Sequence, residues 1–279
     1  MRDKVSVIVC ARNEEQRLER ALHGIRLNDP DEIIVVDDNS TDTTVDIARR
    51  YTSSVIVSRT ESLTQNRQIG IDQARNDLIA MIDADHILIP GDIDRLVSDL
   101  RKYNFDMVTS QLMSYANASV WNSAEEDSWD LTHNFPGPMA MIPVAPTIFK
   151  KSLFEKVRFD GQITVKMDDT DFMYRLGLCK DVRFGVGDTR IRQLHAPGLA
   201  SYLRKFLWYG YGDGEFVRKH PKRTGGILFH QLVRYPLLYS GTAIWRGRTR
   251  AVPFFVLQGL LRFVGLLSYF LQWSTGRVR

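Results

Sequence analysis

The first hundred residues of the chain alternate between short, almost wholly apolar runs and longer stretches whose apolar residues recur every three or four positions. A continuous apolar run is typical of a strand covered on both faces of a parallel sheet, and the longer spacing is typical of a helix. The pattern predicts strands at residues 5–10, 32–37, 55–58, 78–82 and 107–111, and helices at about 15–27, 44–51, 63–74 and 92–103. This alternation predicts an α/β fold with a mostly parallel central sheet flanked by helices.

The pattern becomes less regular from residue 114 to residue 166, where Trp121, Trp129 and a proline-glycine turn at 135–138 occur. We expect this stretch to be a loop-rich half that contacts the substrate, because binding residues concentrate on loops. Helical spacing returns at residues 170–178, and after Pro197 the chain becomes mostly apolar and basic.

The last apolar stretch, residues 252–273, is just long enough to span a bilayer. Polar or small residues recur along it at helical spacing and form one narrow stripe: Gln258, Arg262, Gly265, Tyr269 and Gln272. Arginines flank the stretch on both sides, whereas a spanning helix tends to carry its positive charges on one side. We therefore expect an amphipathic helix in the plane of a membrane. A helix packed into the protein's own core and a spanning helix remain alternatives.

Charge is divided unevenly along the 279 residues, although the net charge is only +4. Residues 190–279 contain 15 Lys or Arg against two acids, and the remainder contains 22 bases against 31 acids. A basic region interleaved with apolar runs fits an anionic membrane surface as its partner. The usual signatures of nucleic-acid-binding modules are missing, so nucleic acid is not expected as a partner.

The cysteines and the amino terminus suggest a compartment. Cys10 and Cys179 have no metal-binding spacing, which favours a reduced intracellular environment. Residues 1–4 lead directly into the first predicted strand and leave no room for a signal peptide. We expect the protein on the cytoplasmic face of a membrane, as a peripheral or monotopic protein.

Two acids directly follow the strand predicted at residues 78–82. Residues two apart in an extended segment point the same way, so Asp83 and Asp85 can present both carboxylates to one cation. Ligands of open α/β sheets bind at the carboxyl ends of strands, and carboxylates suit Mg²⁺ or Mn²⁺. The sequence therefore predicts a divalent-metal site at this position.

Three ordered blocks, residues 5–15 (VSVIVCARNEE), 34–44 (IVVDDNSTDTT) and 81–85 (MIDAD), resemble glycosyltransferase family 2, with a likeness that covers roughly residues 4–196. The resemblance implies a GT-A fold and transfer of a sugar, with inversion, from a UDP- or GDP-linked donor with Mn²⁺ or Mg²⁺ as cofactor. The Gln-x-x-Arg-Trp motif of processive synthases is missing, which favours transfer of a single sugar. The chain resembles membrane-associated members that act on exopolysaccharide, glycolipid or polyprenyl-linked acceptors.

The same resemblance implies a domain plan. Residues 1–198 would form the catalytic domain, with a nucleotide-binding half at about 1–112 and an acceptor half at about 113–198. Residues 199–279 would form a basic, amphipathic helical extension that associates with a membrane. The acceptor would be a lipid-linked or membrane-proximal glycan.

Residue roles follow from the positions that match the family. The implied nucleotide-binding residues are Ala11, Arg12, Glu14, Asp38, Arg67, Asp83 and Ala84, and the implied metal ligands are Asp85 and His195. Simpler structural roles remain open for four of them. Asp38 could cap the following helix, Glu14 could favour a helix dipole, Arg67 could be a solvated helix residue, and His195 could be structural.

The implied catalytic residue is Asp169, within residues 166–175 (KMDDTDFMYR). Displacement at an anomeric carbon requires the acceptor hydroxyl to lose a proton, and a positioned carboxylate can take it. Capping of the helix at 170–178 is the structural alternative, and with a lipid-phosphate acceptor Asp169 would only orient it. The remaining residues assigned to the acceptor or diphosphate are Asp168, Arg175, Arg204 and Trp208.

Other functions fit the same residues less well. A nucleotidyltransferase also uses paired aspartates and a metal, but the glycine-rich basic loop expected after its first strand is missing here. A dinucleotide-dependent oxidoreductase would need a G-x-G-x-x-G segment at that place. A non-catalytic membrane-docking or sugar-binding module agrees with the tail but not with the acids.

Overall fold

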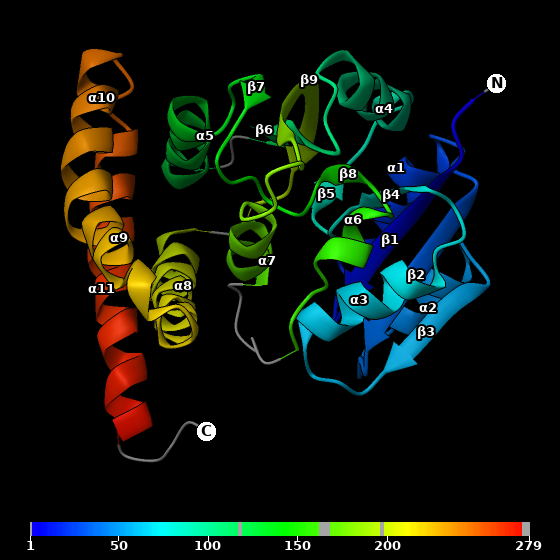
Figure 1. Ribbon diagram of the computed structural model, residues 1–279, viewed down its shortest axis with the longest axis horizontal. Helices are drawn as coiled ribbons and strands as arrows, with labels where there is room; N and C mark the ends of the chain where they lie inside the picture. The colour runs from blue at the N-terminus through cyan, green and yellow to red at the C-terminus, as the bar shows by residue number, and fades with distance from the viewer. Residues whose placement is uncertain (1, 117–118, 162–167, 196–197, 275–279) are drawn as a thin grey trace. The chain divides into compact units, whose positions relative to one another are not determined.

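A computed structural model describes residues 2–116, 119–161, 168–195 and 198–274 (Figure 1). The described chain forms two compact units. Unit 1 contains residues 2–115, 134–161 and 168–194, and unit 2 contains residue 116, residues 119–133, residue 195 and residues 198–274.

Unit 1 is an α/β unit built on one sheet (Figure 1). Within the described residues the strands are β1 (Val5–Ala11), β2 (Glu32–Asp38), β3 (Ser54–Ser58), β4 (Leu78–Met81), β5 (His86–Ile87), β6 (Met107–Ser114), β7 (Gly137–Pro138), β8 (Thr147–Lys150) and β9 (Phe184–Gln193). Their order is β3-β2-β1-β4-β8-β6-β9-β5, with β7 paired to β9. Strands β1, β2, β3 and β4 run parallel, as do β6 and β9, whereas β8 pairs antiparallel with β4 and β6.

Helices cover both faces of this sheet. The helices of unit 1 are α1 (Leu18–Arg26), α2 (Thr44–Arg49), α3 (Leu63–Gln73), α4 (Asp92–Lys102), α6 (Leu153–Lys156) and α7 (Asp168–Leu176). Helices α1, α2 and α4 pack on the face that receives Val7 and Val9 of β1. Helices α3, α6 and α7 pack on the other face with Ile8. The period-2 alternation along β1 therefore supplies two apolar layers, which explains why the strand is apolar throughout.

The predicted strands and helices are present, with changes at their ends. α1 begins at Leu18, later than expected, because Asn13 takes a left-handed conformation with φ 55° and the chain turns before the helix. α2 begins at Thr44 as predicted, and the carboxylate of Asp42 accepts the Thr44 backbone N–H at 3.0 Å.

One expectation about residues 114–166 is wrong. The stretch contains the 13-residue helix α5 (Val120–Thr132), which begins where the Ser119 hydroxyl accepts the N–H of Asn122. Trp129, which we placed in a loop, lies on this helix and is 9% exposed. α5 belongs to unit 2 because its buried face packs against residues that follow 198 in the chain.

Unit 2 is helical in its described residues. Besides α5 it contains α8 (Gly198–Lys219), the 3₁₀ turn η1 (Pro221–Arg223), α9 (Thr224–Phe229), the π-helix η2 (His230–Tyr239), α10 (Ser240–Trp245) and α11 (Ala251–Ser274). Its core joins Ala124 of α5 to Tyr202 and Phe206 of α8 and to Phe254 and Phe255 of α11.

The α8–α11 contact is unusually close. A Cβ on Gly210 would lie 2.0 Å from the carbonyl oxygen of Arg262, and one on Gly265 would lie 2.1 Å from that of Leu207. Small residues on both helices let the two backbones approach. Inside this contact Arg262 makes two hydrogen bonds to the fully buried Asp213, at 2.8 and 2.7 Å.

The orientation we expected for α11 is therefore corrected. Arg262, Gly265 and Tyr269 of the narrow stripe are in contact with α8, so this part of the stripe does not face lipid headgroups or water. The exposed side of α11 is instead apolar, with 45–68% exposure at Leu260, Val264, Leu267 and Leu271. Within the described part of the chain, one helix, Ala251–Gln272, is long and apolar enough to cross a membrane by length and composition, with mean hydropathy 1.8.

Candidate active site

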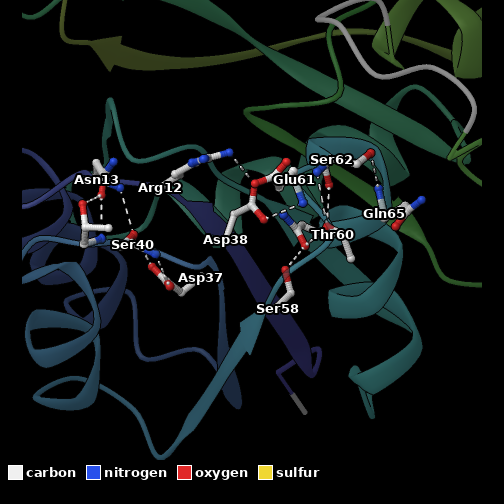
Figure 2. Close-up of polar contacts among 12 residues, drawn as sticks. Arg12, Asn13, Asp37, Asp38, Ser40, Ser58, Thr60, Glu61, Ser62 and Gln65 are labelled. Atoms are coloured by element: carbon white, nitrogen blue, oxygen red, sulfur yellow. Dashed lines mark hydrogen bonds and ion pairs between the residues drawn. The ribbon is translucent and has the colours of Figure 1, made fainter. Parts of the chain in front are cut away.

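Strand β2 ends at Asp38, whose side chain lies between Arg12 and Glu61 (Figure 2). The Asp38 side chain is 10% exposed, and one of its carboxylate oxygens lies 3.5 Å from Nη1 of Arg12. The other oxygen accepts the backbone N–H of Glu61 at 3.0 Å. A carboxylate held from two sides in this way is oriented and retains lone pairs for a further N–H donor.

The loops after β1 and β2 are bonded to each other beside this acid (Figure 2). The N–H of Asn13 donates to Oγ of Ser40 at 2.9 Å, and the Asn13 side-chain oxygen accepts the N–H of Thr41 at 2.9 Å. Asp37 accepts both the hydroxyl and the N–H of Ser40. The local turn is thus made by Asp37, and among the contacts described for Asp38 there is no helix cap.

Ala11 and Glu14 lie close to the end of β1. Ala11 ends β1, is 5% exposed and is in register with Asp37 of β2. The backbone N–H of Glu14 donates to Thr44 Oγ1 at 2.8 Å, and its carboxylate lies 3.5 Å from Nε of Arg17. Because α1 begins at residue 18, Glu14 precedes its first turn and is not the helix-dipole acid that we considered.

A second acidic group follows β4, with the buried Ala84 between its two aspartates. The side chains of Asp83 and Asp85 are 36% and 25% exposed, and their oxygens and a ring nitrogen of His86 all lie within 4.8 Å of one another. Asp85 is also oriented by the end of β9, where Gln193 Nε2 donates to its carboxylate at 2.9 Å. Two partly open carboxylates at this spacing fit the oxygen-rich coordination that Mg²⁺ and Mn²⁺ prefer.

His86 supports this group in a different way. Its Nδ1 accepts the backbone N–H of Asp83 at 3.1 Å, so in the neutral ring the proton lies on Nε2. A protonated nitrogen cannot bind a metal, and the ring is only 2% exposed. We therefore assign His86 to orienting the Asp83 backbone and leave the two carboxylates as the metal-binding atoms.

Arg67 on α3 connects Asp83 to the predicted catalytic acid. Its side chain is 3% exposed, so it is not the solvated helix arginine that we considered. Nη2 lies 3.4 Å from Oδ1 of Asp83, and Nη1 forms an ion pair with Asp169, 102 residues further along the chain. One buried guanidinium thus sets the positions of two carboxylates from different elements.

Asp169 lies in the first turn of α7 and is 33% exposed. Besides pairing with Arg67, it accepts the backbone N–H of Val144 through Oδ2 at 3.2 Å. The carboxylate is thus fixed in place and partly open, as a general base must be. Asp168 is the first residue of α7, and its side chain lies outside the described residues.

Arg175, predicted to face the acceptor or diphosphate, lies on the same helix. It binds Asp171 at 2.8 Å, four residues earlier, and the carbonyl oxygen of Arg158 at 2.8 Å. These contacts hold α7 to the residues before it. Two acids of this segment therefore have different partners. Asp171 binds Arg175 within α7, and Asp169 binds Arg67 of α3.

The other three predicted site residues belong to unit 2. Arg204 is exposed and lies 3.4 Å from the Ser201 hydroxyl, and Trp208 is 42% exposed and stacks on Tyr209. The ring of His195 is 4% exposed, and its Nδ1 lies 2.7 Å from Oε2 of Glu125 on α5. Our interpretation of the sequence missed Glu125, because we read the segment around it as a loop.

The comparisons with known proteins identify the family. The profile of the family described as "Glycosyl transferase family 2" matches residues 6–182. The chain belongs to glycosyltransferase family 2. The family predicted from three short blocks is thereby confirmed.

The similarity to curated proteins covers a shorter part of the chain than the family profile does. An uncharacterised glycosyltransferase of Mycobacterium tuberculosis is 34% identical over 109 residues, which are 39% of this chain and 49% of that protein. One from Rickettsia typhi is 38% identical over 85 residues, 30% of this chain and 29% of that protein. The chain thus spans about half or less of the length of the relatives it matches.

Solved structures share the fold. S. aureus TarS 1–349, in complex with UDP-GlcNAc, aligns with a TM-score of 0.56 at 16% identity, over 98% of this chain and 92% of that one. Glucosyl-3-phosphoglycerate synthase from Mycobacterium tuberculosis, in complex with Mn²⁺, UDP-glucose and phosphoglyceric acid, aligns with a TM-score of 0.54 at 18% identity, over 77% and 79%. At these identities the likeness shows the fold alone, and it confirms the predicted GT-A type of α/β fold.

Proposed function

We propose that this glycosyltransferase moves a single sugar from a nucleotide-diphosphate sugar to a lipid-linked or membrane-proximal glycan, with inversion at the anomeric carbon. The observation that carries the proposal is the position of Arg67, which pairs with Asp83 of the donor group and with Asp169. Such a link sets the distance between a donor and a base before either ligand arrives. The UDP-GlcNAc in TarS and the UDP-glucose in the synthase support a nucleotide-sugar donor.

The strand ends would hold the nucleotide. Asp38 would accept an N–H of the base, since both uracil and guanine present one, and Arg12 beside it would remain close to the ribose or phosphates. Ala11 and Ala84 are small residues at strand ends, which leave room for the nucleotide to approach the backbone. Glu14 would lie near the base and ribose.

The diphosphate would be held through Asp83 and Asp85. A divalent cation bound there would balance the charge that gathers on the leaving nucleoside diphosphate. The chain's own part is to orient these carboxylates, which it does through Gln193 at Asp85 and through His86 and Arg67 at Asp83. The Mg²⁺ and Mn²⁺ in complexes of the mycobacterial synthase support this use.

Asp169 would act as the general base. The acceptor oxygen bonds to the anomeric carbon as the bond from that carbon to the diphosphate breaks, and the acceptor's proton passes to the Asp169 carboxylate. Arg67 and the Val144 N–H keep the carboxylate in place during this transfer. An acceptor that is already an ionised lipid phosphate would need only the orienting role.

We further propose that unit 2 binds the cytoplasmic face of a membrane. Its support is the exposed apolar side of α11, together with exposed Leu237, Leu238, Ile244 and Trp245 on η2 and α10. Because the polar stripe of α11 is used inside the unit, insertion of this apolar side in the membrane plane fits the structure of unit 2. Basic residues of the same region would meet anionic headgroups.

A panel of nucleotide sugars tests the donor assignment. With Mn²⁺ present, one UDP- or GDP-linked sugar should raise the melting temperature and be slowly hydrolysed, because a ligand of the native state stabilises it. Asp85→Ala should lower that hydrolysis by about 10²-fold or more, since it removes a metal-binding carboxylate. Asp92→Ala, outside the site and bonded to Arg95, is the control for a lost acid. Release of diphosphate from a nucleoside triphosphate would instead indicate a nucleotidyltransferase.

A further inference from the structure

Unit 2 contains a buried polar cluster around Glu125 that the proposed reaction does not yet use. Oε2 of Glu125 lies 2.7 Å from Nδ1 of His195 and accepts the Tyr202 hydroxyl at 2.7 Å, and Oε1 accepts Nζ of Lys205 at 2.8 Å. Glu125 is 5% exposed. The side chains of His195, Tyr202 and Lys205 therefore meet around one carboxylate of α5.

The carboxylate of Glu125 acts as a hydrogen-bond acceptor toward its neighbours. Oε1 accepts from Nζ of Lys205, which has only donor hydrogens, and Oε2 accepts from the Tyr202 hydroxyl. A carboxylate whose two oxygens both accept has no hydrogen to offer, so the hydrogen bond with His195 is donated by its Nδ1–H.

With the proton on Nδ1, a neutral imidazole carries a lone pair on Nε2. Trp129 stacks on the ring at 5.2 Å between centroids and 18° between planes, which holds the ring in one orientation.

The Nε2 atom of His195 has no hydrogen-bond partner among the residues that the structure describes. It is buried in a ring that is 4% exposed, and it makes no hydrogen bond within the described part of the chain. A buried polar atom without a partner needs an explanation, and a missing ion is one of the usual ones. Histidines that bind metals typically donate their other N–H to a carboxylate, which fixes both tautomer and orientation.

We propose that Glu125 is a positioning residue that holds His195 as its Nδ1–H tautomer, so that Nε2 is available to a divalent cation. The inference rests on the proposed function, because that function supplies the reason for a divalent cation. It adds a part for α5, and it assigns Tyr202 and Lys205 to holding the Glu125 carboxylate in place.

The first test needs no substitution. In the full chain labelled with ¹⁵N-histidine, long-range ¹H–¹⁵N spectra should show His195 with a protonated Nδ1 and an unprotonated Nε2. Substoichiometric Mn²⁺ with UDP should broaden the His195 ring signals selectively, whereas Mg²⁺ with UDP should shift Nε2. An Nε2–H tautomer, or no response of His195 to either metal, would overturn the proposal.

The second test measures Mn²⁺ affinity by calorimetry in the presence of UDP. Glu125→Ala should weaken Mn²⁺ binding about 10- to 100-fold, as loss of a histidine's carboxylate partner does in other metal sites. Glu125→Gln keeps an oxygen acceptor for Nδ1–H and should restore part of the affinity. Asp127→Asn is the matched control, since this acid lies two residues away on α5 but pairs with Arg248 and Arg250. It should lower stability and leave Mn²⁺ affinity unchanged.

These outcomes separate the two proposals. If the unsubstituted chain binds neither Mn²⁺ nor a nucleotide, the proposed function itself fails. If it binds both, and folded Glu125→Ala binds Mn²⁺ equally well with an unchanged His195 tautomer, only the role of Glu125 is wrong.

Discussion

In unit 1 the acids at the sheet edge remain partly open, whereas in unit 2 the acids lie inside helix contacts. Asp83 and Asp169 keep about a third of their side-chain surface exposed and share one buried arginine. Asp213 and Glu125 are almost fully enclosed and already paired with Arg262 and Lys205. A carboxylate can bind a ligand only if it retains lone pairs that solvent or substrate can reach.

The surface of unit 2 is more apolar along α11 than the site of unit 1, where carboxylates are partly exposed. The exposed side of α11 in unit 2 is leucine and valine, while Arg262 of the same helix is paired with Asp213 inside the unit. Two of the flanking arginines that we expected to meet lipid, Arg248 and Arg250, instead bind Asp127 on α5. The comparison indicates that unit 1 is organised for polar ligands and unit 2 for an apolar environment.

The largest expected effect tests the open acids of unit 1. Asp169→Asn keeps an oxygen for the Val144 N–H but cannot take a proton, so turnover should fall about 10²- to 10⁴-fold. Affinity for the nucleotide with Mn²⁺ should remain nearly the same. Steady-state kinetics and calorimetry measure the two quantities.

Asp171→Asn is the control for that substitution, because Asp171 lies on the same helix but pairs with Arg175. It should reduce stability and leave turnover of the folded enzyme similar. If Asp169→Asn abolished nucleotide binding, Asp169 would belong to the donor site and not to the acceptor side.

The next effect tests the enclosed pair of unit 2. Arg262→Met removes the partner of Asp213, which is 0% exposed, and leaves a buried charge that only Gln231 contacts by a hydrogen bond within the described residues. Breaking one side of a buried ion pair typically costs about 3–5 kcal/mol in the free energy of unfolding. Urea unfolding followed by far-UV circular dichroism would measure the loss.

Arg246→Met provides the comparison for this prediction, since Arg246 is exposed and lies over the Trp245 ring. Its loss should cost no more than about 1 kcal/mol. Equal effects of the two substitutions would mean that the enclosed pair does not hold α8 and α11 together.

The smallest effect tests the apolar surface. Leu260→Glu with Leu267→Glu should reduce partitioning onto anionic vesicles about 10- to 100-fold, because each leucine contributes roughly 1.5–3 kcal/mol when fully buried. Leu178→Glu, at 66% exposure in unit 1, should change partitioning little. Sedimentation with vesicles measures both.

Salt gives an independent check on the same surface. Raising the salt concentration should weaken vesicle binding only in part, because apolar burial persists when charges are screened. Vesicle binding that is unaffected by the paired leucine substitutions would contradict the assignment of this side of α11 to a membrane.

Several site residues could be located from sequence because their positions depend on short stretches of chain. Asp38 is the last residue of β2 and Asp83 comes two residues after β4, so both acids lie at the carboxyl ends of apolar strands. The link between Arg67 and Asp169 could not be predicted, since it joins residues 102 apart. Glu125 was missed because α5 has no clear apolar face when read alone.

For the first 111 residues, the sequence by itself determined which segments form the main strands and helices and which acids follow the strands, and it indicated the family to which the chain belongs. These features depend on the period of apolar residues and on neighbours a few positions away. Only the tertiary structure decided what each polar side chain contacts. The stripe of α11 looks the same in sequence whether it faces water, lipid or protein, and its burial against α8 depends on two glycine contacts and an ion pair to Asp213, 49 residues earlier.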